Sequence, residues 1–180
     1  MPAADPRHVI VEILRNAKNG INKTKLFQAF YLSHLVYTHN TPGLLTPWKM
    51  VHTPKGPGID ASYQLLESLE ADGYLTRKVT SDGLFKECEF CWTGKELLAN
   101  ALPQAAIDAI QRATAYVLPL TASQISQLTH EHSRSWIEAT NGETLDIYTD
   151  LIDDEEYDRR NEQLDRLEAD IEAALKDAGQ

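Results

Sequence analysis

The chain has 180 residues, of which 42% are hydrophobic and 24% are charged, a balance typical of a folded globular protein. This length corresponds to about one compact domain with an appendage. The sequence shows neither a run of about 20 apolar residues nor the apolar stretch of a signal peptide, so we expect no membrane span and a cytoplasmic location. Two cysteines are too few for a disulfide framework.

The formal net charge of -10 is concentrated near the C-terminus. Residues 145–180 contain 13 acidic and 4 basic side chains, whereas the other 144 residues contain 14 acidic and 13 basic ones. Phosphate binding requires a positive local potential, so this composition disfavours nucleic acid as a partner. The acidic segment is instead suited to attract a basic protein.

The N-terminal part of the chain predicts two helices. Asp5 can cap the first helix, Pro6 suits its first position, and Gly20 closes it. Asn22 can cap a second helix that runs to about residue 39. Apolar side chains cover most of the circumference of this second helix, which predicts a buried central position; they are Leu26, Phe27, Phe30, Tyr31, Leu35, Val36 and Tyr37.

The next segment predicts a loop, a helix and a hairpin. Residues 48–51 are apolar and either helical or extended, and the prolines and glycines of 53–58 exclude regular structure there. Asp60 can cap a third helix that stops at Gly73. Residues 74–92 then predict a β-hairpin, because two β-rich runs flank an Asp-Gly turn.

Helical signals dominate the C-terminal half. Residues 93–96 match a capping box for a fourth helix, Pro103 and Pro119 bracket a fifth, and a second capping box at 121–124 opens a sixth. Residues 145–151 are typical of a short strand or an extended strap. The predicted fold class is therefore mainly α with a small β-hairpin, that is, α+β.

A charged helix is expected from about Asp154 onward. Its apolar or seam positions follow a 3-4 spacing, at Tyr157, Arg160, Leu164, Leu167, Ile171 and Ala174. Two alternatives remain open: the helix lays this stripe on the body, or it pairs with the same helix in a homodimer. We divide the chain into a helical domain, 1–152, and an acidic C-terminal helix, 153–180. We expect that helix to be dispensable for folding but to shape partner choice or oligomeric state.

No residue pattern assembles a catalytic, cofactor or metal site. Cys88 and Cys91 lie three apart in a predicted strand and so point to opposite faces, and a second ligand pair is missing. The Pro-Gly segment does not have the spacing of a phosphate-binding loop. His130 and His132 are better explained as capping or core-edge groups than as catalysts. We therefore expect a protein that is not an enzyme and uses no cofactor and no metal.

The order helix, hairpin, helix over residues 60–93 resembles the winged-helix pattern of bacterial regulators. The recognition helix would then span 60–72, whose charged residues are all acidic. Base and phosphate readers require the opposite sign of charge. Under this alternative the phosphate contacts would come from the hairpin, at Arg77, Lys78 and Lys86.

Three motifs taken together resemble the Panacea domain, the family of SocA-like and GepA-like antitoxins. They are Lys25-Leu26 followed by Tyr31, Trp48-Lys49 followed by Gly56-Pro57, and His130 followed by Trp136. The matches run from about residue 21 to residue 136. The resemblance implies a helix-rich, non-enzymatic antitoxin of a bacterial or phage toxin–antitoxin pair.

Physical reasoning assigns these motif residues a mainly structural role. Gly56 and Pro57 would fix a loop, Trp136 would supply an apolar anchor, and His130 would hydrogen-bond a loop carbonyl. The expected function is a protein-binding module that neutralises a toxin, a protein of basic character, by direct contact. The alternative is a winged-helix DNA-binding regulator of prophage or mobile-element origin.

Overall fold

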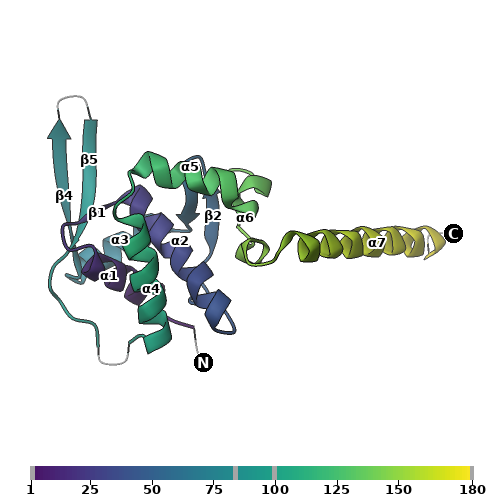
Figure 1. Ribbon diagram of the computed structural model, residues 1–180, viewed down its shortest axis with the longest axis horizontal. Coiled ribbons are helices and arrows are strands. Elements are labelled where there is room, and N and C mark those ends of the chain that lie inside the picture. The colour runs from purple at the N-terminus through teal and green to yellow at the C-terminus, as the bar shows by residue number, and fades with distance from the viewer. Residues whose placement is uncertain (1–2, 83–84, 99–100, 179–180) are drawn as a thin grey trace.

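The computed structural model describes residues 3–82, 85–98 and 101–178, with side chains outside 80–87, 170, 172–175 and 177–178. Within this described part, helices dominate and the strands form two small antiparallel sheets (Figure 1). The elements, in chain order, are α1 (Pro6–Asn16), β1 (Ile21–Asn22), α2 (Lys23–Asn40), β2 (Met50–Thr53), β3 (Gly56–Ile59), α3 (Ser62–Ala71), β4 (Leu75–Asp82), β5 (Phe85–Trp92), α4 (Gln104–Val117), α5 (Ala122–His132), α6 (Arg134–Glu138), the 3-10 turn η1 (Ile147–Asp150) and α7 (Asp154–Ala178).

Helix α2 is the centre of the core, as its all-round apolar sequence predicts. The Asn22 side chain caps it by accepting a hydrogen bond from the Lys25 amide at 3.0 Å. The helix packs against α1, α4, α5 and β3. Leu26 and Phe30 are fully buried in this packing, together with Ile110 of α4.

The larger sheet has the strand order β1-β5-β4. The predicted hairpin is confirmed, with Leu75 opposite Trp92 and Asp82 opposite Phe85. The two-residue strand β1 adds to β5, placing Ile21 opposite Phe90. This short pairing ties the hairpin to the start of α2.

The Pro-Gly segment is more regular than its composition predicts. Gly56 to Ile59 form β3, paired with β2 so that Pro57 lies opposite His52. The exclusion of regular structure over 53–58 was therefore wrong. Proline lacks only the amide donor and is tolerated in the strand of a small two-stranded sheet, while Pro54 and Lys55 form the turn.

Asp60 and Thr93 were predicted to cap helices, and neither does so in the structure. Asp60 continues the hairpin, with its amide donating to the Lys49 carbonyl at 3.0 Å, and the chain turns at Ala61 (φ 48°) before α3 begins. No helix forms at 93–98. Thr93 instead closes the base of the β4–β5 hairpin, where its hydroxyl donates to the Gly73 carbonyl at 2.7 Å.

The predictions for the remaining helices are closer to the structure. Helix α1 begins after Asp5, whose carboxylate accepts from the Arg7 amide at 2.8 Å. Helix α4 begins just after Pro103, and the Thr121–Gln124 capping box opens α5. Residues 145–151 form neither a full strand nor a plain strap. Leu145 bonds to Met50 through its amide, and the following residues wind into η1.

Helix α7 projects away from the body (Figure 1). Leu164, Leu167 and Ile171 are 56%, 54% and 50% exposed. The alternative in which this stripe packs on the body was therefore wrong. Among the described residues, no helix is both long enough and apolar enough to cross a bilayer.

Candidate functional site

The three sequence motifs meet where α2, the β2–β3 hairpin and the α5–α6 segment come together. We call this place the α2–α5 junction. Its members are Gln28 and Tyr31 of α2, His52 and Gly56 of the hairpin, Thr129 and His130 of α5, Ser133, Ser135 and Trp136 around α6, and Asp150 of η1. Residues separated by most of the chain thus meet at this junction through hydrogen bonds and ring stacking.

Gly56 brings the hairpin against α2. It adopts φ +111°, and a Cβ atom at this position would lie 2.2 Å from Nε2 of Gln28. Gln28 is only 1% exposed, and its Oε1 accepts a hydrogen bond from the Thr129 hydroxyl at 2.8 Å. Only glycine combines this backbone conformation with this close approach.

Trp136 links α6 to the hairpin. Its indole Nε1 donates to the Thr53 carbonyl at 2.9 Å, and both His52 and His130 stack on its ring, at 4.5 and 4.0 Å between centroids. The expectation that His130 bonds the loop carbonyl was wrong. The stacked orientation holds the His130 ring parallel to the indole, and the indole N–H makes the bond.

Asp150 collects several donors at the other end of the junction. It accepts from the Tyr31 hydroxyl at 2.6 Å, from the Ser135 amide at 3.0 Å and from the Ser135 hydroxyl. Ser133 lies within 2.8 Å of the Tyr31 hydroxyl. Burial, followed by the Asp150 carboxylate, raises the pKa of Tyr31 far above its ordinary value. Tyr31 therefore stays protonated and acts as a hydrogen-bond donor, not as a base or nucleophile.

The remaining motif residues also make internal contacts. Lys25 donates to the Leu118 carbonyl at the end of α4, at 2.8 Å. Trp48 donates through Nε1 to the Asp60 carbonyl at 2.6 Å. Pro57 is buried within β3, whereas the Lys49 side chain is exposed. The motif set therefore builds a scaffold, in keeping with the structural role expected from the sequence.

Several members of the junction were not predicted from the sequence. Gln28 is a polar residue in the middle of an otherwise apolar helix, which is the signal that marks it as a buried, paired group. Ser133 caps α6 by accepting from the Trp136 amide, and Asp150 is one of many acidic residues near the C-terminus. Their pairing with α2 is long-range and has no local signature.

The residues considered for phosphate or metal chemistry are dispersed. Arg77 pairs with Glu70 at 3.0 Å, Lys78 is exposed, and the side chain of Lys86 lies outside the described residues. Cys88 and Cys91 are free, half-buried thiols. Over the residues that the structure describes, no group of three or more His, Cys, Asp or Glu side chains is arranged to hold a metal ion.

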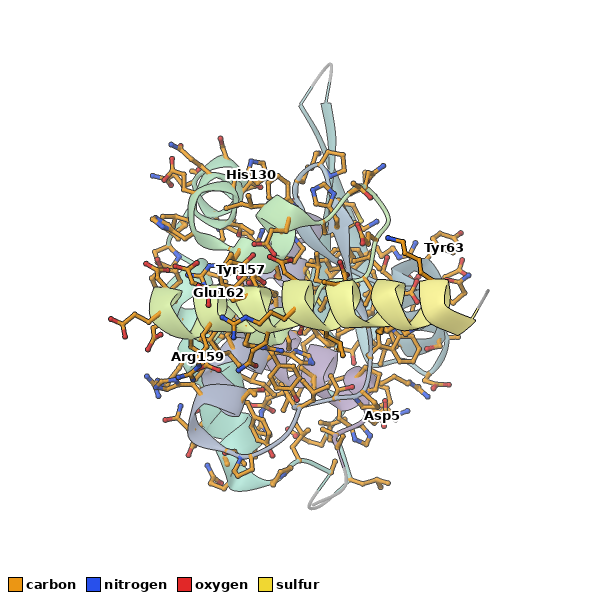
Figure 2. The ribbon with its side chains drawn as sticks, turned by 90° about the vertical axis from the view of Figure 1, so that its right-hand side faces the viewer. Asp5, Tyr63, His130, Tyr157, Arg159 and Glu162 are labelled. Atoms are coloured by element: carbon orange, nitrogen blue, oxygen red, sulfur yellow. The ribbon has the colours of Figure 1, made fainter. Side chains whose placement is uncertain are left out.

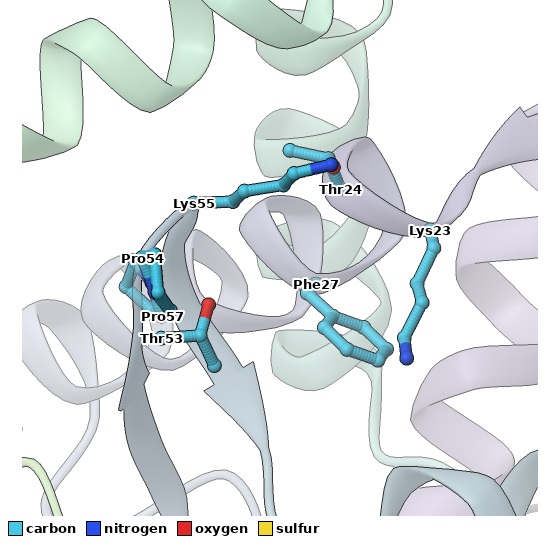
Figure 3. A pocket seen from close by; sticks show the side chains of 7 residues that line it. All are labelled: Lys23, Thr24, Phe27, Thr53, Pro54, Lys55 and Pro57. Atoms are coloured by element: carbon cyan, nitrogen blue, oxygen red, sulfur yellow. The ribbon is translucent and has the colours of Figure 1, made fainter. Parts of the chain in front are cut away.

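A pocket of about 390 Å³ lies beside the junction (Figure 3). Apolar groups line it, chiefly Phe27, Pro54 and Pro57, and two lysines border it. The Lys23 ammonium lies 5.2 Å from the Phe27 ring centroid, and Lys55 extends from the hairpin turn toward Thr24. The pocket therefore has an apolar wall bordered by two ammonium groups. Among its described lining residues there is no carboxylate or imidazole suited to acid–base chemistry.

Helix α7 carries an exposed apolar stripe formed by Leu164, Leu167 and Ile171. Figure 2 views the molecule from the side on which this helix projects, with Tyr157, Arg159 and Glu162 labelled in its first turns. The base of the helix is fixed by Arg134, which pairs with Asp154 and lies 4.4 Å from the Tyr157 ring centroid. Beyond Tyr157, every residue through Ala169 is exposed.

Comparison of the chain with protein-family models, with curated proteins and with solved structures finds no match. We therefore infer the function from the residues and their geometry.

Proposed function

We propose that this chain is an antitoxin-like, protein-binding module that neutralises the cognate toxin of a bacterial or phage toxin–antitoxin system by direct contact in the cytoplasm. The observation that carries the proposal is the exposure of the apolar stripe of helix α7, which runs along an acidic helix that projects from the body. An exposed stripe of this kind suits a protein partner better than a small molecule.

The resemblance to the Panacea domain supports the antitoxin part of the proposal. Each of its three motifs contributes a residue to the α2–α5 junction, although the motifs come from segments far apart in the sequence; these residues are Tyr31, Gly56, His130 and Trp136. Their polar groups are engaged in internal bonds, as with Lys25, Tyr31 and Trp136. A shared scaffold with a separate binding surface fits a family in which related domains meet different toxins.

A non-catalytic role is consistent with the chemistry of the buried polar groups. The Asp150 carboxylate is engaged by four donors from Tyr31, Ser133 and Ser135, and Tyr31 remains protonated. The His52 and His130 rings are stacked on Trp136. Tyr31, Ser133 and Asp150 line a cavity of about 190 Å³, but their polar groups are bonded to one another and Tyr31 is held protonated, which suits a structural role better than that of a nucleophile with its base.

The test is co-expression with the neighbouring reading frame of the source genome. We expect that a small toxic protein encoded there arrests growth alone, that this chain restores growth, and that the two proteins co-elute in size-exclusion chromatography. A catalytically inactive form of the toxin serves as the control for complex formation. If the neighbour is toxic and this chain neither rescues growth nor forms a complex, the proposed function fails.

A second candidate is a winged-helix DNA-binding regulator of prophage or mobile-element origin. It is favoured by helix α3 followed directly by the β4–β5 hairpin and by the sheet order β1-β5-β4, although the order along the chain, α1, β1, α2, β2, β3, α3, β4, β5, inserts a further hairpin between α2 and α3. It is opposed by charge, because α3 carries Glu67 and Glu70 without a cation, and Arg77 is paired with Glu70.

Fluorescence anisotropy with duplex DNA at physiological salt separates the two candidates. We expect weak binding or none. Nanomolar, sequence-selective binding that is lost in the double variant Lys78→Gln/Lys86→Gln would favour the regulator instead.

A further inference from the structure

Within the described part of the chain, helix α7 is anchored to the body at its first turns. Arg134 pairs with Asp154 and covers the Tyr157 ring, and the Tyr157 hydroxyl donates to Glu138. The acidic first turn, Asp154 to Glu156, matches the positive end of the helix dipole. The base of the helix is thus held on the body, and residues 158–169 are exposed to solvent.

The apolar stripe of this helix has the spacing of a coiled-coil seam. Tyr157, Leu164 and Ile171 recur every seven residues, and Arg160 and Leu167 form the second column between them. The three aliphatic members are each at least half exposed. A seam of this kind is completed when a second helix packs against it.

The residues beside the seam decide which helix fits. The flanking positions carry Glu156, Asn161, Gln163 and Glu168, and the sequence continues the same positions with Asp170, Leu175 and Asp177. A second copy of α7 in antiparallel orientation would set acidic side chains at these positions against each other. In a parallel pair the two Arg160 side chains would meet within the seam.

The cations Arg159 and Arg166 of α7 do not relieve this repulsion. Arg159 pairs with Glu156 and Arg166 pairs with Glu162, at 3.5 Å in the second case, so each is engaged by a carboxylate of its own helix. A partner helix with Lys or Arg beside its own apolar stripe would meet the flanking carboxylates favourably. It would also need an acidic residue opposite Arg160.

From this charge complementarity we infer that α7 is a docking helix for a basic amphipathic helix of another protein, bound along Leu164, Leu167 and Ile171. The inference rests on the proposed function in one respect: the protein that supplies the basic helix in the cell would be the toxin. The flanking carboxylates set the partner's charge, and the aliphatic seam sets its register.

The first experiment uses the full chain and a synthetic probe. The probe is a 28-residue peptide with Leu at both seam columns and Lys at the flanking positions, labelled for fluorescence anisotropy. We expect a one-to-one complex that weakens at least tenfold between about 50 and 500 mM salt. By sedimentation equilibrium, the chain alone should be a monomer at micromolar concentration.

Matched variants locate the contact. Leu164→Asn/Leu167→Asn should weaken peptide binding at least tenfold, while Asp158→Asn/Asp165→Asn, which removes two charges off the seam, should change it less than threefold. Glu168→Lys should weaken binding severalfold more than Glu162→Lys, which makes the same charge change on the opposite side. Circular dichroism checks that each variant keeps its helix.

Two results would overturn the inference. One is equal peptide binding by Leu164→Asn/Leu167→Asn and the parent chain, which would indicate diffuse attraction without docking. The other is a dimer of the chain alone that this double variant dissociates, which would make a second copy the occupant. If the Leu164→Asn/Leu167→Asn variant still rescues growth from the toxin, the docking inference is wrong but the proposed function is not. If the chain binds the peptide along this seam but neutralises no toxin, the proposed function is wrong but the docking inference is not.

Discussion

The α2–α5 junction and helix α7 both contain many polar side chains, but they use them in opposite ways. In the junction, Gln28, Tyr31 and Asp150 are tied to distant segments by hydrogen bonds in a buried setting. In α7, Arg159 and Arg166 bond mainly to neighbours one turn away, on a surface exposed to water. Polar groups at low dielectric are costly to leave unpaired, whereas exposed ion pairs contribute little.

This difference assigns different tasks to the two regions. The junction fixes one arrangement of α2, the β2–β3 hairpin and α6, because the loss of one polar group there would leave its buried partner without a hydrogen bond. Helix α7 depends on local interactions and can change its surface without disturbing the body. Substitutions should therefore act on stability in the first region and on binding in the second.

The largest effect is expected from Gly56→Ala. The new Cβ would overlap Nε2 of Gln28 and would force a left-handed backbone on alanine, so we expect a loss of about 3 kcal/mol in the free energy of unfolding. Gly43 also has a positive φ, +96°, but no atom within 4 Å of an added Cβ. Gly43→Ala should cost only about 1 kcal/mol. Urea unfolding followed by tryptophan fluorescence measures both, and equal losses would show that the Gln28 contact is unimportant.

Tyr31→Phe probes the Asp150 end of the junction. Removing the hydroxyl deprives the Asp150 carboxylate of its 2.6 Å donor and leaves Ser133 with one partner fewer. We expect a loss of about 2 kcal/mol in the same unfolding assay. The control is Tyr116→Phe, since Tyr116 is 55% exposed, and it should be nearly neutral. A neutral Tyr31→Phe would mean that water replaces the hydroxyl.

His34 predicts a pH dependence of the body. The ring is 1% exposed, its Nδ1 lies 3.0 Å from the Phe30 carbonyl, and burial lowers the pKa of His34. Because the unfolded chain then binds the proton more readily, stability should fall as pH decreases below about 6.5. His34→Gln should flatten this fall between pH 7 and pH 5, and His39→Gln, at an exposed position of the same helix, should not. Identical slopes for the two variants would contradict the assignment.

The smallest effect on stability is expected from truncation after Ile152. The shortened chain would lack the ion pair of Arg134 with Asp154 and the hydrogen bond of Tyr157 to Glu138, both at the exposed base of α7. We expect a change below about 1 kcal/mol in unfolding of residues 1–152, which retain all three tryptophans. Aggregation or a loss of several kcal/mol would show that α7 belongs to the core after all.

The parts of the fold that local patterns encode could be predicted from the sequence. The apolar circumference of α2, the Asp-Gly hairpin and the Thr121–Gln124 capping box each correspond to an element of the structure. The failures came where a distant partner changes the role of a residue. Thr93 had the pattern of a cap, but its hydroxyl donates to the Gly73 carbonyl.

The candidate site was predicted unevenly for the same reason. Gly56 and Trp136 were expected to be structural, and both lie in the junction. The other junction members Gln28, His52 and Asp150 could not be found, because the spacing along the chain does not record which surfaces meet. The exposure of Leu164 and Leu167 also required the structure, since a 3-4 stripe looks the same whether it packs on the body or not.

The connection between the body and α7 has a mechanical consequence. After α6 the chain runs along β2, with the His52 amide donating to the Glu143 carbonyl and the Leu145 amide donating to the Met50 carbonyl, and it then reaches Asp150. Tension applied at the C-terminal end would therefore arrive first at the contacts of Tyr157 with Glu138 and of Asp154 with Arg134, then at the bonds of Asp150 to Tyr31 and Ser135, and next at the segment beside β2. A partner that pulls on the arm would load the hairpin and α2 before it loads α1 or α4.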